Sequence, residues 1–221
     1  MSAAIESGQN RRPKSRPETV QKREAIIHAA MDIFGSRGYA KTSLAEIAEK
    51  VGMTHSGVLH HFGSKQNLFL EAVDYRDLAD LAALGRTDMP SGRAQFEHLI
   101  DTAFRNSERM AVVQAFVVLS TEALTGDSPV LDHFQARYRR LRADITENFR
   151  QLCAEEGVTE QDSIEHAAAS ILAVMDGLQY QWLLEQNVVQ LGEATRFAIH
   201  AIVDAALGPN PSPSAGTSPA E

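Results

Sequence analysis

Three of the eight histidines in this sequence stand close together, at His55, His60 and His61. Imidazole is a common zinc ligand, and two histidines four residues apart on a helix form a chelating pair. The spacings here are five, six and one residues, and no carboxylate stands beside these histidines to complete a set of ligands. The sequence therefore predicts no metal site, and we expect no other cofactor.

Enzymatic chemistry is also not indicated. The chain has no glycine-rich phosphate loop, no nucleophile elbow and no pair of acids at a catalytic spacing. Its one cysteine, Cys153, excludes a disulfide framework and a multi-cysteine metal site, and its place in an amphipathic helix predicts an inert core residue. We expect a binding protein rather than an enzyme.

Two short helices are predicted on either side of Gly52. The segment Ser43–Glu46 has the capping-box pattern, in which the serine and glutamate side chains satisfy free N–H groups of a first helical turn. A helix should therefore cover about 44–51. Thr54 is a second N-cap and predicts a helix over about 55–62. Because Gly52 accepts the positive φ of a sharp turn, the stretch predicts a helix-turn-helix.

The second of these helices should have one inward and one outward face. At 100° per residue, Val58 and Phe62 fall on one side and should pack against the core. The outward residues carry groups that can hydrogen-bond to DNA base edges or contact a thymine methyl group: His55, Ser56, Leu59 and His60. His61 falls at the boundary between the two faces.

The motif belongs to a longer set of residues at fixed spacing: Ile27, Ala30, Phe34, Gly38, Tyr39, Thr42, Ile47, Ala48, Gly52, Leu59, His60, His61, Phe62, Gly63, Ser64, Lys65 and Leu68. This set, over about residues 20 to 80, resembles the DNA-binding domain of the TetR family of bacterial transcriptional regulators. Two positions depart from the family pattern, because Leu59 stands where tyrosine is common and Gly57 where threonine is frequent. We therefore expect no base readout by a tyrosine hydroxyl.

The resemblance implies a dimer that binds a palindromic double-stranded DNA operator through the second motif helix, with Thr54 at its N-cap. It also implies that Thr42, His61 and Lys65 hold phosphates. Lys65 stands at the N-terminus of a further predicted helix, where free N–H groups attract anions.

Charge is divided unevenly along the chain, whose formal net charge is −8. Residues 1–73 hold 10 Lys+Arg and 7 Asp+Glu, for +3, and the remainder holds 11 and 22, for −11. A basic N-terminal part suits DNA phosphate, and an acidic body limits unspecific adhesion to nucleic acid. Acidic surfaces are also common among soluble proteins, which explains the body equally well.

These patterns predict an all-α protein of about nine helices in two domains. We expect a disordered basic arm at 1–17, a TetR-type DNA-binding domain at 18–80 with its motif at about 43–62, a helical ligand-binding and dimerisation domain at 81–207, and a disordered proline-rich tail at 208–221. The arm either contacts DNA or stays solvated. No apolar run reaches the roughly 20 residues of a membrane span, so we expect a cytoplasmic protein without a membrane partner.

Three helices of the predicted body carry further signals. The apolar run 110–119 lacks a polar face and predicts a helix in the centre of the body. A long helix from about 131 carries four arginines, at positions 137, 139, 140 and 142, followed within helical reach by Asp144 and Glu147. That pattern favours a solvated helix face over a second nucleic-acid surface.

The last two predicted helices, at about 162–186 and 193–207, are candidates for a homodimer interface. Small side chains let helices approach closely, and two helices from each subunit make a four-helix contact, as in the family that the sequence resembles. The predicted interface residues are Ile171, Met175, Leu178, Ala194, Ala198, Ala201 and Ala205. The same two helices are also compatible with ordinary intrachain packing.

A ligand-responsive homodimeric repressor is the predicted function. Its small-molecule effector would bind among the body helices, with a signal travelling along the helix that starts at Lys65. Candidate lining residues mix aromatic and amide groups: Phe104, Met110, Gln114, Phe116, Tyr138, Met175, Gln179 and Trp182. Each of them is also compatible with plain core packing. The alternative is a helix-turn-helix protein whose body serves only dimerisation or protein docking, with no small-molecule inducer.

Overall fold

The computed structural model describes residues 17–83, 90–125, 130–158 and 163–208, and over these ranges the chain forms helices and no strand. The helices, in chain order, are α1 (Pro17–Arg37), α2 (Leu44–Lys50), α3 (His55–Phe62), α4 (Lys65–Ala83), α5 (Arg93–Ser107), α6 (Met110–Glu122), α7 (Leu131–Glu156), α8 (Ile164–Leu184) and α9 (Leu191–Leu207). The predicted all-α architecture is confirmed.

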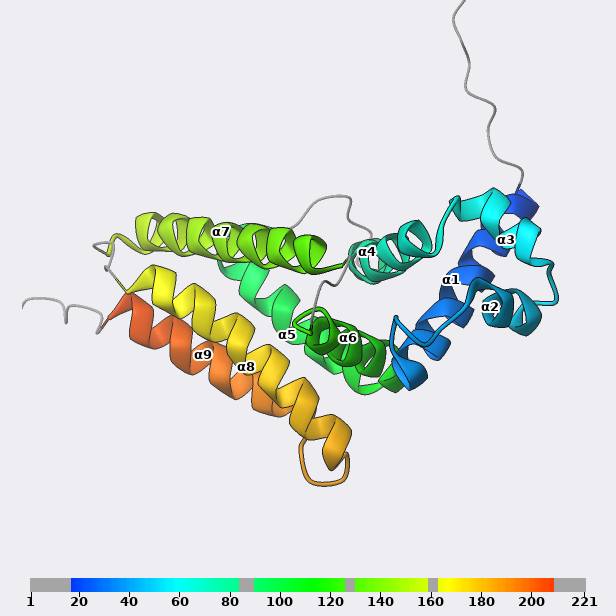
Figure 1. Cartoon of the computed structure of the whole chain (residues 1–221). Helices are drawn as coiled ribbons and strands as arrows, with labels where there is room; N and C mark the ends of the chain where they lie inside the picture. The colour runs from blue at the N-terminus through cyan, green and yellow to red at the C-terminus, as the bar shows by residue number, and fades with distance from the viewer. Residues whose placement is uncertain (1–16, 84–89, 126–129, 159–162, 209–221) are drawn as a thin grey trace, which may run out of the picture.

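The helix-turn-helix forms at one end of the molecule, where α2 and α3 pack beside α1 (Figure 1). The predicted capping box is present, since the Ser43 hydroxyl accepts from the Glu46 N–H at 3.2 Å and the Glu46 carboxylate accepts from the Ser43 N–H at 2.8 Å. The Thr54 hydroxyl accepts from the Gly57 N–H at 3.1 Å and caps α3. Gly52 takes a φ of 66°, as the sharp turn requires.

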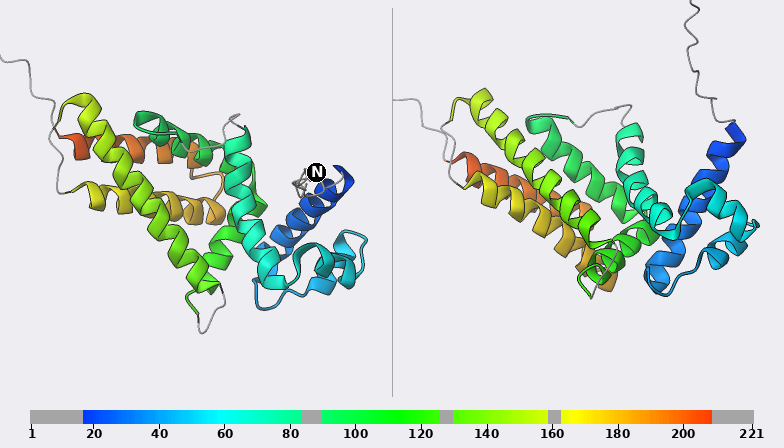
Figure 2. Two further views of the ribbon diagram at one scale, coloured as in Figure 1. Left: turned by 90° about the horizontal axis from the view of Figure 1, so that it is seen from above. Right: turned by 45° about the horizontal axis from the view of Figure 1, so that its top comes forward.

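Helix α4 packs with α1 and α3, and helices α5 to α9 form the body. Helices α8 and α9 lie side by side along one edge (Figures 1 and 2), where α7 packs against α8 and α5 packs against α9. The contact between α5 and α9 is close, because a Cβ added to Gly192 would lie 2.3 Å from the ring of Phe104. A glycine at this position therefore allows α9 to pack directly on an aromatic side chain of α5.

One buried cluster joins the DNA-binding helices to the body. It contains residues of α1 to α4, such as Phe34 and Phe69, together with Phe116 of α6 and Phe134 of α7. Helices α1 and α6 touch at backbone distance, since a Cβ on Gly35 would lie 3.0 Å from the backbone nitrogen of Ala115. A second cluster is formed by α5, α7, α8 and α9. A shift of α6 or α7 must therefore disturb packing in the DNA-binding part.

The apolar run 110–119 was expected in the centre of the body, and helix α6 packs against α1, α5 and α8 without being buried on every side. Val113, Ala115, Phe116 and Leu119 are buried, but Met110 is 46% exposed, and Val117 and Val118 are partly exposed. Helix α6 lies between the DNA-binding helices and α7 and α8, and its remaining apolar side chains border two hollows. An apolar run can line cavities as well as fill a core.

The expected basic arm, except for Pro17 at the start of α1, and the expected tail beyond Gly208 lie outside the described residues. Within the described ranges, no helix is both long and apolar enough to cross a membrane. The same ranges contain no group of three or more His, Cys, Asp or Glu side chains that could hold a metal ion.

Candidate operator interface and effector cavity

Helix α3 is held in place by two buried side chains and by Arg23 of α1. Val58 is fully buried and Phe62 is 4% exposed, as the 100° spacing predicts. Arg23 of α1 lies over the Phe62 ring, with its Cζ 4.3 Å from the ring centroid. The same guanidinium donates to the His61 carbonyl and pairs with Glu71 of α4. Arg23 thus ties the C-terminal end of α3 to α1 and α4.

The outward face of α3 presents the polar groups that the sequence predicted for it. His55, Ser56 and His60 are exposed, as is the capping residue Thr54, while Leu59 is partly buried against the core. These residues form the outer surface of a short helix at the end of the molecule. The arrangement suits insertion into a DNA groove, with the imidazoles and the serine hydroxyl available for hydrogen bonds.

Two residues that were predicted to contact phosphate, Thr42 and Lys65, donate instead to carbonyls of the turn between α1 and α2. The Thr42 side chain is only 3% exposed, and its hydroxyl donates to the Gly38 carbonyl at 2.7 Å, so its predicted contact with a phosphate was wrong. Lys65 donates to the carbonyls of Tyr39 and Thr42, both at 2.9 Å, and lies 4.2 Å from the Tyr39 ring centroid. Carbonyls outside regular helix need such partners. Lys65 therefore holds the turn.

The third predicted phosphate contact is His61, whose ring is partly buried at the edge of α3. Burial, followed by the positive charge of Arg23, lowers the pKa of His61 below its ordinary value. A partly buried imidazole at this edge can still hydrogen-bond to a phosphate.

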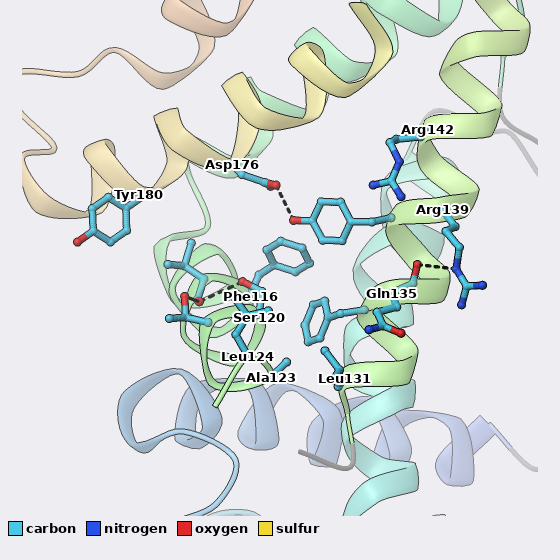
Figure 3. Close-up of a pocket in the computed structure, with 14 residues that line it drawn as sticks. Phe116, Ser120, Ala123, Leu124, Leu131, Gln135, Arg139, Arg142, Asp176 and Tyr180 are labelled. Carbon is cyan, nitrogen blue, oxygen red and sulfur yellow. Dashed lines mark hydrogen bonds between the residues drawn. The ribbon is translucent and has the colours of Figure 1, made fainter. Parts of the chain in front are cut away.

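A cavity of about 700 Å³ lies between α6, α7 and α8 (Figure 3). Phe116 and Phe134 form part of its wall, with their ring centroids 5.7 Å apart in an edge-to-face arrangement. The Tyr138 hydroxyl donates to the Asp176 carboxylate at 2.5 Å. The other lining residues are Val117, Ser120, Thr121, Ala123, Leu124, Leu131, Gln135, Arg139, Arg142 and Tyr180. This volume and mixture are typical of a site for a small organic molecule.

The predicted ligand residues only partly coincide with this cavity. Phe116 and Tyr138 line it, and the other six do not. Gln114 borders a second, more open hollow between α1 and α6, and Met110 is exposed at the start of α6. Phe104 packs beneath Arg196 of α9, with the guanidinium carbon 4.6 Å from the ring centroid.

The three predicted residues on α8 do not line the cavity, and two of them, Met175 and Gln179, stand one position before residues that do. Met175 and Trp182 are buried within the subunit, and Gln179 donates to the Met175 carbonyl at 3.1 Å. The cavity is lined instead by Asp176 and Tyr180, each one residue later. One residue turns a side chain by about 100° around the helix, which separates the core from the cavity wall.

Two arginines that line the cavity were not among the predicted ligand residues, because the arginines of α7 were predicted to form a solvated face. Arg139 and Arg142 of α7 line the cavity. Their spacing was an available signal, since Arg142 follows Phe134 by eight residues and Tyr138 by four, on one side of α7. Arg137 is 4% exposed and lies over the Phe116 ring at 5.5 Å, so it also departs from the predicted solvated face.

The residues predicted for the dimer interface are mostly buried on α8 and mostly accessible on α9. On α8, Ile171 is fully buried and Met175 is 9% exposed, so these two pack within the subunit, while Leu178 is partly buried against an internal cluster. The period-3.6 apolar stripe of α8 faces its own core. On α9, Ala194 and Ala198 are partly exposed and Ala201 and Ala205 are exposed. These four remain candidates, beside Phe197, which is 78% exposed.

The outward face of α8 is formed by other residues. Ala173, Tyr180 and Leu184 are exposed, and Gly177 has no atom within 4 Å of an added Cβ. These positions recur every three or four residues and so form one stripe. The stripe combines small side chains with large apolar ones, as a helix-packing surface does.

The end of α6 is attached directly to the turn before the helix-turn-helix. The Glu122 carboxylate accepts from the N–H groups of Tyr39 at 2.5 Å and Ala40 at 2.7 Å. Burial and then the charge of Glu122 raise the pKa of Tyr39 above its ordinary value. Thr121 and Ala123, on either side of Glu122, line the cavity. This clamp, Glu122 on the 39–40 turn, links the cavity wall to the DNA-binding part.

Comparison with known proteins places these features in one family. The family described as bacterial regulatory proteins, tetR family, matches residues 26–72, and the family described as BetI-type transcriptional repressor, C-terminal, matches residues 92–208. The repressor BepR of Brucella suis is 27% identical over 180 residues, 77% of this chain and 84% of that protein. The regulator BetI of Rhizobium meliloti is 27% identical over 182 residues, 81% and 86% of the two chains.

A solved structure shares the whole architecture. SmeT, the repressor of a multidrug efflux pump of Stenotrophomonas maltophilia, superposes with a TM-score of 0.67 at 20% identity, over 91% of this chain and all of that chain. The two family matches together cover both the helix-turn-helix and the helical body, and both describe transcriptional regulators rather than enzymes. The chain is therefore a DNA-binding transcriptional regulator of the TetR family.

Proposed function

We propose that this regulator is a homodimeric repressor that a small molecule, bound in the cavity between α6, α7 and α8, releases from its DNA operator. The observation that carries the proposal is the buried cluster that joins the cavity wall to the DNA-binding helices. A body that serves only dimerisation or docking does not explain a cavity of about 700 Å³ beside that cluster. A protein of the same fold, SmeT, has been solved in complex with triclosan.

The operator is proposed to be a palindromic double-stranded DNA read by α3 from each subunit. His55, Ser56, Leu59 and His60 would contact base edges, with Thr54 and His61 at the flanking backbone. Lys65 would act through the turn that it holds rather than as a free cation. We place the protein in the cytoplasm, with its operator, its second copy and its effector as partners, and assign it no cofactor and no membrane partner.

The dimer is proposed to form through the outward faces of α8 and α9. Two such helices from each subunit make a four-helix contact with small residues at its centre. The exposed Phe197 and Leu184 would then be covered by the partner, which removes large apolar side chains from water. The division of the chain into a DNA-binding domain at 18–80 and a ligand-binding and dimerisation domain at 81–207 belongs to the same proposal.

The proposed signal passes from the cavity through aromatic packing and the Glu122 clamp. Phe134, in the cavity wall, lies 6.3 Å from the Phe69 ring of α4, and Phe69 lies 5.3 Å from the Tyr39 ring. A ligand that moves Phe134 or the end of α6 therefore displaces the turn at Tyr39, which Lys65 and Glu122 hold from two sides. The predicted route along α4 is thus joined by a second route through α6.

Substitution of His60 by alanine is expected to relax base discrimination at one position of each half-site. The loss should be about 1 to 3 kcal/mol per half-site, the usual worth of a good base contact, with little change in binding to random DNA. Fluorescence anisotropy with the operator and with single-base variants measures it. The matched control is His28→Ala, an exposed histidine of α1. If His60→Ala weakened specific and random DNA equally, its role in base readout would be rejected.

The proposed function is tested by two experiments in sequence. Selection of bound fragments from random DNA should yield a palindrome with half-sites about one helical turn or slightly more apart. A thermal-shift screen should then yield compounds that stabilise the wild-type protein but not Ser120→Trp, in which the indole fills the cavity. Such compounds should weaken binding to the selected site. A cavity ligand that left operator affinity unchanged would contradict the proposal.

A further inference from the structure

We propose that the effector is an amphipathic anion: a carboxylic or comparable acid carried on a flat apolar body. This inference rests on the proposed function of the cavity between α6, α7 and α8. It follows from three properties of that cavity, namely the aromatic surface on one side, the positive charge at its α7 border, and the engagement of the carboxylate that faces it.

The apolar part of the ligand is specified by the aromatic wall. Phe116 and Phe134 contribute buried rings, Tyr138 of α7 contributes a partly buried one, and the ring of Tyr180 of α8 is exposed at the border. Val117, Leu124 and Leu131 complete the apolar lining. Aromatic side chains bury flat molecules efficiently because offset and edge-to-face contacts are available on every side. The cavity therefore favours a planar apolar body.

The charged part is specified by Arg142. This side chain is exposed at the cavity border and, among the residues that the structure describes, has no hydrogen-bond or ion-pair partner. Figure 3 shows it extending from α7 on the side of the cavity where Asp176 lies. A planar guanidinium beside an apolar surface is well suited to bind a carboxylate with two parallel hydrogen bonds. Arg142 is thus the anchor that we assign to the anionic group.

A cationic ligand is disfavoured by the same surroundings. Arg139 and Arg142 both line the cavity, and Arg137 lies just behind the wall, over the Phe116 ring. Asp176 is the carboxylate in the lining, and it already accepts a short hydrogen bond from the Tyr138 hydroxyl. A cation would face two guanidinium groups and compete with Tyr138 for its one counter-ion. The charges therefore select anions over cations of the same shape.

The inference is tested with three probes that share one ring system. They are naphthalene-2-carboxylate, its neutral carboxamide, and a naphthylmethyl trimethylammonium cation. Isothermal calorimetry with the full chain at pH 7 should show the carboxylate binding about tenfold to a hundredfold more tightly than the amide, since a charge-assisted pair is gained. The cation should bind more weakly than the amide.

Two variants locate the anionic group. Arg142→Gln should remove the advantage of the carboxylate while leaving amide affinity nearly unchanged, because the aromatic wall is intact. Arg140→Gln is the matched control, an exposed arginine of the same helix that does not line the cavity, and it should keep the wild-type order. Ser120→Trp should abolish binding of every probe, which shows that binding is inside the cavity.

The outcomes separate this inference from the proposed function. Equal binding of carboxylate and amide, or tightest binding of the cation, would overturn the anionic class while the cavity still acts as the ligand site. An unchanged carboxylate preference in Arg142→Gln would overturn the assignment of the anchor. Failure of all three probes to bind the wild-type protein would overturn the inference, while the compound screen against Ser120→Trp would still decide the proposed function.

Discussion

Replacement of Ala201 on α9 by arginine is expected to convert the protein into monomers and to weaken operator binding by about 10² to 10⁴-fold. Ala201 is exposed in the small-residue stripe of α9, where a long charged side chain would separate two packed helices. A monomer contacts a single half-site, so it loses the effective concentration that the first bound subunit provides for the second. Sedimentation velocity measures the mass, and anisotropy with the full palindrome measures the affinity.

The control for this substitution is Ala136→Arg, which introduces the same side chain at an exposed position of α7. It should remain dimeric and bind the operator as the wild type does. Binding of Ala201→Arg to an isolated half-site should also be nearly unchanged, since α3 is untouched. Wild-type protein that sedimented as a monomer at micromolar concentration, or a dimeric Ala201→Arg, would refute the proposed interface.

Replacement of Glu122 by glutamine is expected to break the response to the effector while preserving the fold. The carboxylate accepts two backbone N–H groups of the 39–40 turn, and an amide offers a single oxygen and places an NH₂ group against the second donor. The fall in operator affinity caused by a cavity ligand, about 5 to 150-fold for a typical coupling of 1 to 3 kcal/mol, should shrink to a few-fold. Anisotropy with and without saturating ligand gives this ratio.

A purely structural role of Glu122 makes a different prediction. It would lower the melting temperature and the affinity for operator and leave the ratio with and without ligand unchanged. Glu147→Gln is the matched control, because Glu147 is an exposed carboxylate of α7 outside the cavity lining. An effector response of wild-type size in Glu122→Gln would exclude the clamp as part of the signal.

Local signals explain why the helix-turn-helix was predictable. Its caps, the serine at 43 and the threonine at 54, make bonds within three residues, and Gly52 supplies the turn without any distant partner. The inward and outward faces of α3 follow from the 3.6-residue period alone. Helix limits in the body were predictable for the same reason, since apolar periodicity and glycine caps are properties of one segment.

The side-chain contacts of the site were not predictable, because they join segments that are distant in the sequence. The hydroxyl of Thr42 and the amine of Lys65 satisfy carbonyls of a turn whose conformation the sequence pattern does not specify. The side chains of α8 that face the cavity could not be chosen until the rotation of α8 about its own axis was known, and an error of one residue exchanged Asp176 for Met175. The Glu122 clamp joins residues 82 and 83 positions apart.

Effector and operator are expected to weaken each other's binding, and calorimetry measures this coupling. The affinity of a cavity ligand is measured for the free dimer and for the dimer saturated with its selected palindrome, at one salt concentration. The operator should weaken ligand binding by the same factor by which the ligand weakens operator binding, as thermodynamic linkage requires. Equal ligand affinity in the two states would contradict it and leave a dimeric DNA-binding protein whose cavity plays no part in repression.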